Sequence, residues 1–398
     1  MKCIYLNDLG LINALGSNKH NIISTLVNPE ATSTLTSYTL ILDATTPVGR
    51  VLELLLPLPP AYKKYDCRNN QLTIMAYQQI AETVENYKKR YGAHRIGVVM
   101  GTSTSGIASG EAAYKHRALH DVFPTEFDYS QQEIGTCSEF LAKYAGITGV
   151  HYTISTACSS SGKAIISAAR LIQTNICDAV IVGGSDSLCD LTLNGFDALQ
   201  AISPVTCNPF SSHRDGINIG EGAALFIMSH ETSEISLSGW GESSDAYHIT
   251  SPDPKGDGAK SAIKEALSRA KYLPQDIGYI NLHGTATEKN DEVESKIMHE
   301  LFGEADYYCS STKSVMGHTL GAAAAQELAL CWLLLSEQYN PGHYLPEHRW
   351  DGQSDPLLPS LNFTRAETKW QQPRFMSNNF AFGGSNVSLI IERNKNNE

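Results

Sequence analysis

The chain has 398 residues, 42% hydrophobic and 18% charged, which is the ordinary balance of a globular protein. A formal charge of −12 argues against nucleic acid or an anionic membrane surface as a partner. No apolar run approaches the ~20 residues of a membrane helix. The nine cysteines show no zinc-type spacing, and the first residues do not form a signal peptide. We therefore expect a cytoplasmic protein without membrane insertion, long enough for two or three domains or one large duplicated domain.

Short apolar strands alternate with helices along the first half of the chain. Ala164, Ile165, Ala168 and Ile172 lie at helical spacing after one of these strands, as on the buried face of a helix. The sequence predicts strands within residues 2–16, 96–100, 150–155 and 179–182, a helix over 70–91, and a helix after Cys158 that carries Ala164 to Ile172.

The second half repeats this alternation. It predicts strands over 235–239 and 277–282, and helices over 259–270, 292–302 and 321–336. Strands that alternate with helices imply parallel sheets with right-handed crossovers. We therefore expect an α/β fold of two similar halves, residues 1–233 and 234–398, with a frayed polar tail over Asn394–Glu398.

One cysteine has the sequence context of a nucleophile. Cys158 lies between a strand and a helix in the run Thr156-Ala-Cys-Ser-Ser-Ser-Gly162, whose small residues allow a tight turn. A helix N-terminus lowers the pKa of a nearby thiol, and the amide N–H of the cysteine can face a developing oxyanion. A tightly packed structural cysteine is the alternative interpretation, which we retain for the other eight cysteines.

Two histidines occur in similar small-residue loops. His283 ends an apolar strand in Asn281-Leu-His-Gly-Thr-Ala-Thr287, and His318 precedes an Ala-rich helix in Ser311–Gly321. Neutral imidazoles directed at one point would stabilise the enolate that forms on decarboxylation, although hydrogen-bonded structural histidines are also common at strand ends. Lys313 and Glu327 are candidates for a buried ion pair that orients them.

Together these motifs resemble the β-ketoacyl-acyl carrier protein synthases of type I/II, condensing enzymes of the thiolase fold. The resemblance runs along the whole chain. Further matching stretches are Asn208–Gly216, Gly220–Gly222, Asp245–Pro252, Asp291 with Glu294, and Asn379–Asn386.

The resemblance implies a layered αβαβα thiolase-like core with the cysteine in the N-terminal half and both histidines in the C-terminal half. It implies that Cys158 accepts the acyl group and that His283 and His318 bind malonyl thioester and assist its decarboxylation. Lys313 and Glu327 would organise the site, and Phe382 would gate it. Backbone N–H groups of Cys158 and Phe382 would form the oxyanion hole.

The implied reaction extends the acyl chain by two carbons and needs no cofactor or metal. The implied partners are acyl carrier protein in its acyl and malonyl forms. Family members are dimers, so we expect a homodimer or a heterodimer with a related chain-length-factor subunit. A fatty acid, polyene or polyketide pathway fits, and aryl polyene assembly is one hypothesis.

Three positions depart from the family pattern. Ala381 replaces the first glycine of the gate loop, and its Cβ would restrict backbone motion beside Phe382. The loop Thr102-Ser-Thr-Ser105 is rich in hydroxyls, which predicts either a surface turn or an acyl pocket adapted to a chain other than a saturated fatty acid. Gln200 stands where typical members place a basic residue for carrier docking.

A carrier protein presents an acidic helix, so the docking rim is expected to be locally basic. The candidate clusters are Lys63, Lys64 and Arg68, and Lys115 with Arg117.

The main alternative function is a non-catalytic chain-length partner, which the presence of Cys158, His283, His318 and Lys313 disfavours. A thiolase would need a second catalytic cysteine near the C-terminus, and the last one, Cys331, lies in a helical run. A CoA-primed synthase would have Asn where His318 stands. A Gly-x-Ser-x-Gly hydrolase elbow in its usual context is absent from the sequence.

Overall fold

The structure is a computed structural model that describes residues 2–31, 33–303 and 305–394. Its main feature is a sheet of ten strands in the order β10-β9-β11-β12-β8-β1-β7-β6-β4-β5, and a separate hairpin contains β2 and β3. The predicted frayed tail lies outside the described residues from position 395 onward.

The N-terminal half supplies one side of this sheet. Its strands are β1 (Ile4–Ile12), β2 (Thr36–Thr39), β3 (Thr45–Val48), β4 (Ile96–Gly101), β5 (His151–Ile154), β6 (Ala179–Asp186) and β7 (Gly222–Ser229). Its helices are α1 (Lys19–Val27), α2 (Arg68–Gln78), α3 (Ala81–Tyr91), α4 (Ile107–His120), α5 (Thr136–Ala145), α6 (Ser160–Gln173) and α7 (Asp190–Ala198).

The C-terminal half supplies the other side. Its strands are β8 (Ile235–Ser244), β9 (Tyr279–Asn281), β10 (Tyr308–Ser310), β11 (Arg374–Ala381) and β12 (Ser385–Arg393). Its helices are α8 (Asp257–Ala270), α9 (Glu288–Phe302), α10 (Lys313–Met316) and α11 (Ala323–Leu335).

The two halves repeat the same strand order. Read from each edge inward, β5-β4-β6-β7-β1 corresponds to β10-β9-β11-β12-β8, and β1 and β8 join the halves through a short antiparallel contact at Ile4–Leu237 and Tyr5–Ser236. In each series the first three strands run parallel to one another, and each of the last two pairs antiparallel with the strand before it.

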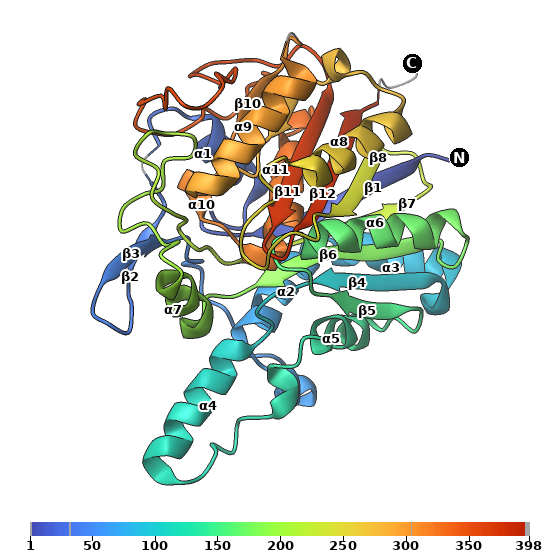
Figure 1. Cartoon of the computed structure of the whole chain (residues 1–398). Helices are drawn as coiled ribbons and strands as arrows, with labels where there is room; N and C mark the ends of the chain where they lie inside the picture. Colours follow the sequence, from blue (N-terminus) through green and yellow to red (C-terminus); the bar gives the residue numbers. More distant parts are fainter. Residues whose placement is uncertain (1, 32, 304, 395–398) are drawn as a thin grey trace.

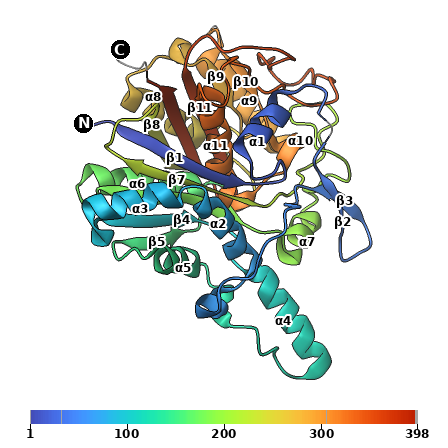
Figure 2. The same cartoon turned by 180° about the vertical axis from the view of Figure 1, so that it is seen from behind.

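Helices cover the outer faces of the two halves of the sheet, and further helices pack between the inner faces (Figures 1 and 2). Helices α6 and α11 pack together between them, while α2 and α5 cover the outer face of the N-terminal strands and α8 covers that of β8 and β12. Every residue of α11 is buried, which explains its almost uniformly apolar sequence. This layering places the ends of β5, β9 and β10 close to the N-termini of the central helices.

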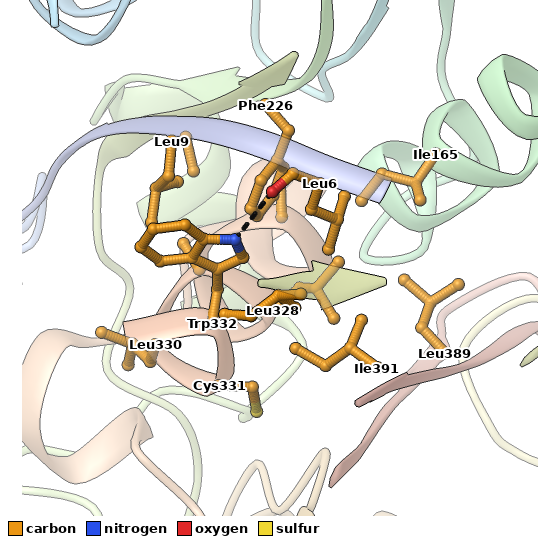
Figure 3. Close-up of a cluster of buried hydrophobic side chains, with 14 of the residues drawn as sticks. Leu6, Leu9, Ile165, Phe226, Leu328, Leu330, Cys331, Trp332, Leu389 and Ile391 are labelled. Atoms are coloured by element: carbon orange, nitrogen blue, oxygen red, sulfur yellow. Dashed lines mark hydrogen bonds between the residues drawn. The ribbon is translucent and has the colours of Figure 1, made fainter. Parts of the chain in front are cut away.

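The core is continuous from the sheet to α11 (Figure 3). Trp332 of α11 packs among Leu9, Leu328 and Phe226, and its indole N–H donates a 3.1 Å hydrogen bond to the carbonyl of Leu6. A buried indole N–H left without an acceptor would be costly, so this bond fixes the position of α11 against β1.

Two details differ from the sequence-based prediction. The sheet is mixed rather than parallel, because β1, β7, β8 and β12 pair antiparallel with their neighbours and β11 turns directly into β12 without a crossover. The helix predicted over 70–91 is two helices that break at Gln79–Ile80. There the Gln79 amide exchanges hydrogen bonds with the backbone of Leu11 in β1, at 2.7 and 3.3 Å.

Helix α4 projects from the body of the molecule in both views (Figures 1 and 2). Among the described residues, no helix has the length and apolar character needed to cross a membrane.

Candidate active site

Cys158 occupies a sharp turn between β5 and α6. The preceding residue, Ala157, has a φ of 51°, which is unfavourable for a residue with a Cβ. The Ser160 hydroxyl donates to the carbonyl of Ala157 at 2.6 Å and accepts the N–H of Thr156 at 2.9 Å. The Ser160 side chain therefore holds the turn in place. The strained turn presents the sulfur at the start of a buried helix.

His318 is held by the N-terminal half of the chain. Its N–H donates to the carbonyl of Asn218 at 2.7 Å, and its carbonyl accepts the N–H of Gly220 at 2.9 Å. A Cβ at Gly220 would lie 2.5 Å from the carbonyl oxygen of Met316, so only glycine permits this approach. With its backbone fixed in this way, the His318 Nε2 lies 3.0 Å from the Cys158 sulfur.

His283 lies just beyond the end of β9, and a carboxylate holds its loop. The N–H groups of His283 and Gly284 donate to the two oxygens of Glu294 at 2.8 and 2.7 Å. The His283 and His318 ring centroids are 5.4 Å apart with the planes nearly perpendicular. One ligand-type atom each from Cys158, His283 and His318 lies within 4.8 Å of the others.

Lys313 and Glu327 form an ion pair whose side chains are each 1% exposed. Burial, followed by the nearby Lys313 cation, holds the pKa of both His283 and His318 well below the usual value, so both imidazoles are neutral at neutral pH. The trio formed with Cys158 also has the spacing of a metal site, but the buried ammonium of Lys313 opposes a second cation there.

The Cys158 thiol does not have the lowered pKa expected from its helix. Burial raises the pKa of the Cys158 thiol to about 11, against the opposing effects of Lys313 and of the N–H groups of Phe382 and Cys158. The sulfur lies too deep for the helix terminus to compensate for its desolvation. The resting pair is therefore a neutral thiol beside a neutral imidazole.

A pocket of about 400 Å³ leads to these groups. Phe382 lines it and packs against Phe196 with ring centroids 5.4 Å apart. Gln200, Thr285, Thr287 and Lys289 also line the pocket. The lining is therefore mixed, with aromatic rings beside polar side chains, and suits a group that has both apolar and polar parts.

The hydroxyl-rich loop is not a surface turn. Thr102, Thr104 and Ser105 are at most 3% exposed, and the hydroxyls of both threonines donate to the buried carboxylate of Asp186. These two hydroxyls are therefore engaged inside the protein, so the surface-turn interpretation was wrong. The other interpretation, an acyl chain that is not a plain saturated fatty acid, stays a prediction.

Neither predicted basic cluster is fully available for docking. Arg68 is bonded to Glu221, a fully buried carboxylate that also receives the N–H groups of Val51 and Leu188. Lys115 pairs with Asp190. Lys63, Lys64 and Arg117 remain predicted docking residues.

The structure thus brings Cys158, His283, His318, Lys313 and Glu327 into one buried cluster, and Phe382 lines the pocket that leads to it. The contacts of Asn218, Glu294 and Asp186 build this cluster, but none of the three was assigned a role from the sequence, although Glu294 was one of the positions that match the family. Their signal was weak, because each is a single polar residue in a strand end, loop or helix, and only the fold shows that its neighbours carry the site.

In a comparison with known protein families, each half of the chain matches a domain of the same family. The family description "Beta-ketoacyl synthase, N-terminal domain" matches residues 67–233, and "Beta-ketoacyl synthase, C-terminal domain" matches residues 235–344. Nodulation protein E of Rhizobium leguminosarum bv. trifolii is 32% identical over 76% of both chains. The chain belongs to the β-ketoacyl synthase family. It is accordingly an acyltransferase, and the expected thiolase-like α/β fold is confirmed.

Two further β-ketoacyl synthase relatives cover most or all of the chain. The 3-oxoacyl-[acyl-carrier-protein] synthase 2 of Coxiella burnetii is 32% identical over 76% of both chains. The ketosynthase ApeO of Xenorhabdus doucetiae, solved in complex with its chain length factor ApeC, is 43% identical, with a TM-score of 0.93 over 99% of this chain and 98% of its own.

Proposed function

We propose that this β-ketoacyl synthase condenses an acyl group held on Cys158 with malonyl-acyl carrier protein and extends the chain by two carbons. The observation that carries the proposal is the 3.0 Å approach of the His318 Nε2 to the Cys158 sulfur inside a buried pocket, with His283 beside it. No cofactor takes part in the proposed reaction.

In the first half-reaction the Cys158 sulfur attacks the carbonyl carbon of an acyl-carrier thioester. The tetrahedral oxyanion lies against the N–H groups of Cys158 and Phe382, which face the sulfur. Collapse breaks the carrier C–S bond, so that the carrier leaves as a thiol and the acyl group stays on Cys158. The raised thiol pKa makes proton removal part of this step, and the proton ends on the carrier sulfur, which leaves as the thiol. The His318 Nε2, 3.0 Å from the Cys158 sulfur, keeps its N–H for the second half-reaction.

In the second half-reaction malonyl-carrier enters the same pocket. Loss of CO2 leaves the electron pair on the α-carbon as an enolate, whose oxygen is stabilised by N–H donation from His283 and His318. The neutral state of both rings suits this role, since each has one N–H to donate. The α-carbon attacks the acyl carbonyl, and Cys158 leaves as a thiolate that recovers a proton.

We further propose that Lys313 and Glu327 are positioning residues for this cluster and that Phe382 is the gate. We retain the division into functional halves 1–233 and 234–398, which the repeated strand order supports.

The proposal also includes a pathway and a partner subunit. The 43% identity to ApeO, solved with its chain length factor, supports aryl polyene assembly and a heterodimer with a related chain-length-factor subunit. Polyene extension would require the pocket to accept a rigid conjugated chain.

The test is a condensation assay with the purified chain, alone and with a co-expressed sister subunit. The proposal predicts a 3-ketoacyl-carrier two carbons longer than the primer, released together with CO2. Preference for an aryl-primed conjugated chain over a saturated chain of equal length would support the pathway, and the reverse preference would contradict it. Product from acyl and malonyl carriers with Cys158→Ala would contradict the mechanism.

A further inference from the structure

Asp186 is a fully buried carboxylate at the end of β6 that accepts hydrogen bonds from four residues. Its Oδ1 accepts the Thr102 hydroxyl at 2.6 Å and the N–H and hydroxyl of Thr104 at 2.8 Å each. The Ser103 N–H donates to both oxygens, at 2.8 and 3.1 Å. The Ala322 N–H donates to Oδ2 at 3.2 Å.

These donors come from two segments that carry the reactive groups. The loop 102–104 touches the nucleophile turn, because the Ser103 hydroxyl donates to the carbonyl of Ala157 at 3.2 Å, directly before Cys158. Ala322 belongs to the short turn Leu320–Ala322 that follows His318. Asp186 is therefore linked to the Cys158 turn through Ser103, and to the segment of His318 through Ala322.

The two segments are also in close contact. A Cβ at Gly321 would lie 2.6 Å from the Ser103 nitrogen and 2.8 Å from Asp186 Oδ2, so the turn after His318 lies directly against the loop and its carboxylate. Packing this tight transmits a small shift of one segment to the other.

We propose that Asp186 is a positioning residue for the condensation, and that its carboxylate sets the distance between the Cys158 sulfur and the His318 Nε2. The hydroxyls of Thr102 and Thr104 serve this carboxylate, which gives the hydroxyl-rich loop a role. This inference rests on the proposed function of Cys158.

The chemistry of the contacts decides which substitutions are informative. In Asp186→Asn one oxygen becomes an NH2 group that faces N–H and O–H donors, so at least one contact becomes repulsive. Thr104→Val keeps the shape of the side chain but removes the bond to Asp186 and the 3.1 Å bond accepted from the Ser187 N–H. Thr104→Ser keeps both.

A matched control separates positioning from plain stability. Thr364 is buried, and its hydroxyl donates to the carbonyl of Pro346 at 2.5 Å in the C-terminal loop, outside the cluster described above. Thr364→Val therefore makes the same chemical change at a site without a contact to Cys158 or His318 among the described residues.

The experiment measures two rates at Cys158 and the melting temperature of each variant. The first rate is acylation by acyl-carrier, followed by intact-protein mass spectrometry, and the second is alkylation by iodoacetamide, followed at the Cys158 peptide. Displacement of a reacting atom costs up to about a hundredfold in rate. We expect Thr104→Val and Asp186→Asn to lose about tenfold to a hundredfold in both rates, and Thr104→Ser to retain them.

Thr364→Val is expected to lower the melting temperature as much as Thr104→Val does while it keeps both wild-type rates. Wild-type rates in Thr104→Val and Asp186→Asn would overturn the inference. So would a loss of acylation with normal alkylation, which would place the defect at carrier binding and not at the sulfur. If the wild type accepts no acyl group, the proposed function fails by itself, and alkylation still decides the inference.

Discussion

The buried pair Lys313–Glu327 can be dissected with two variants. Both side chains are 1% exposed, so Lys313→Met leaves the Glu327 carboxylate buried without its cation. Breaking such a pair from one side costs about 3–5 kcal/mol, whereas replacing both partners with apolar side chains is close to neutral. We expect Lys313→Met to lose about 3–5 kcal/mol of unfolding free energy, and the double variant Lys313→Met/Glu327→Leu to regain most of it.

Activity is expected to follow a different pattern. The Lys313 cation opposes the rise in the pKa of Cys158 that burial causes. Both variants lack this cation, so both should acylate Cys158 more slowly. The single variant should lose at least about tenfold, or about 1.4 kcal/mol, and the double variant somewhat less, because it also lacks Glu327, which raises the pKa of Cys158. Denaturant unfolding and mass-spectrometric acylation measure the two quantities on the same samples. A stable double variant with the wild-type acylation rate would refute the electrostatic role of Lys313.

Three further predictions concern Cys158 and its gate. Because burial raises the pKa of Cys158 to about 11, its alkylation by iodoacetamide should rise about tenfold per pH unit from about pH 6 to 9, and a plateau near neutrality would contradict this. In Cys158→Gln both histidines remain, so malonyl-carrier decarboxylation should continue at a raised rate, and its loss would show that the imidazoles depend on the thiol. Ala381→Gly should accelerate acylation by freeing the backbone beside Phe382, and an unchanged rate would remove Ala381 from the gating mechanism.

Much of the fold and the identity of the cluster could be predicted from the sequence. Cys158 and His283 each follow an apolar strand, His318 precedes an Ala-rich helix, and all three lie among small residues, which is a local signal. The repeated alternation of strands and helices predicted the two halves. The strands β7, β11 and β12 escaped prediction because their buried residues follow no period of two, and β11 even buries Ser377, Asn378 and Asn379. Their direction depends on long-range pairing, which no local pattern shows.

Electrostatics was the least predictable property. The position of Cys158 near a helix N-terminus predicted a lowered pKa, but the effect of burial depends on how α11 and the gate loop close over the sulfur. Asp186 is a similar case. In the sequence it is a lone acid after Gly183-Gly184-Ser185, and only the fold brings Thr102, Thr104 and Ala322 to it.

Acylation of Cys158 is the most direct test of the central claim. The measurement is the intact mass of the wild type and of Cys158→Ala after incubation with a panel of acyl-carrier thioesters, with and without the candidate sister subunit. The account predicts a mass gain equal to the acyl group in the wild type, at Cys158, and none in the variant. An equal gain in both proteins, or no gain under any condition, would contradict it.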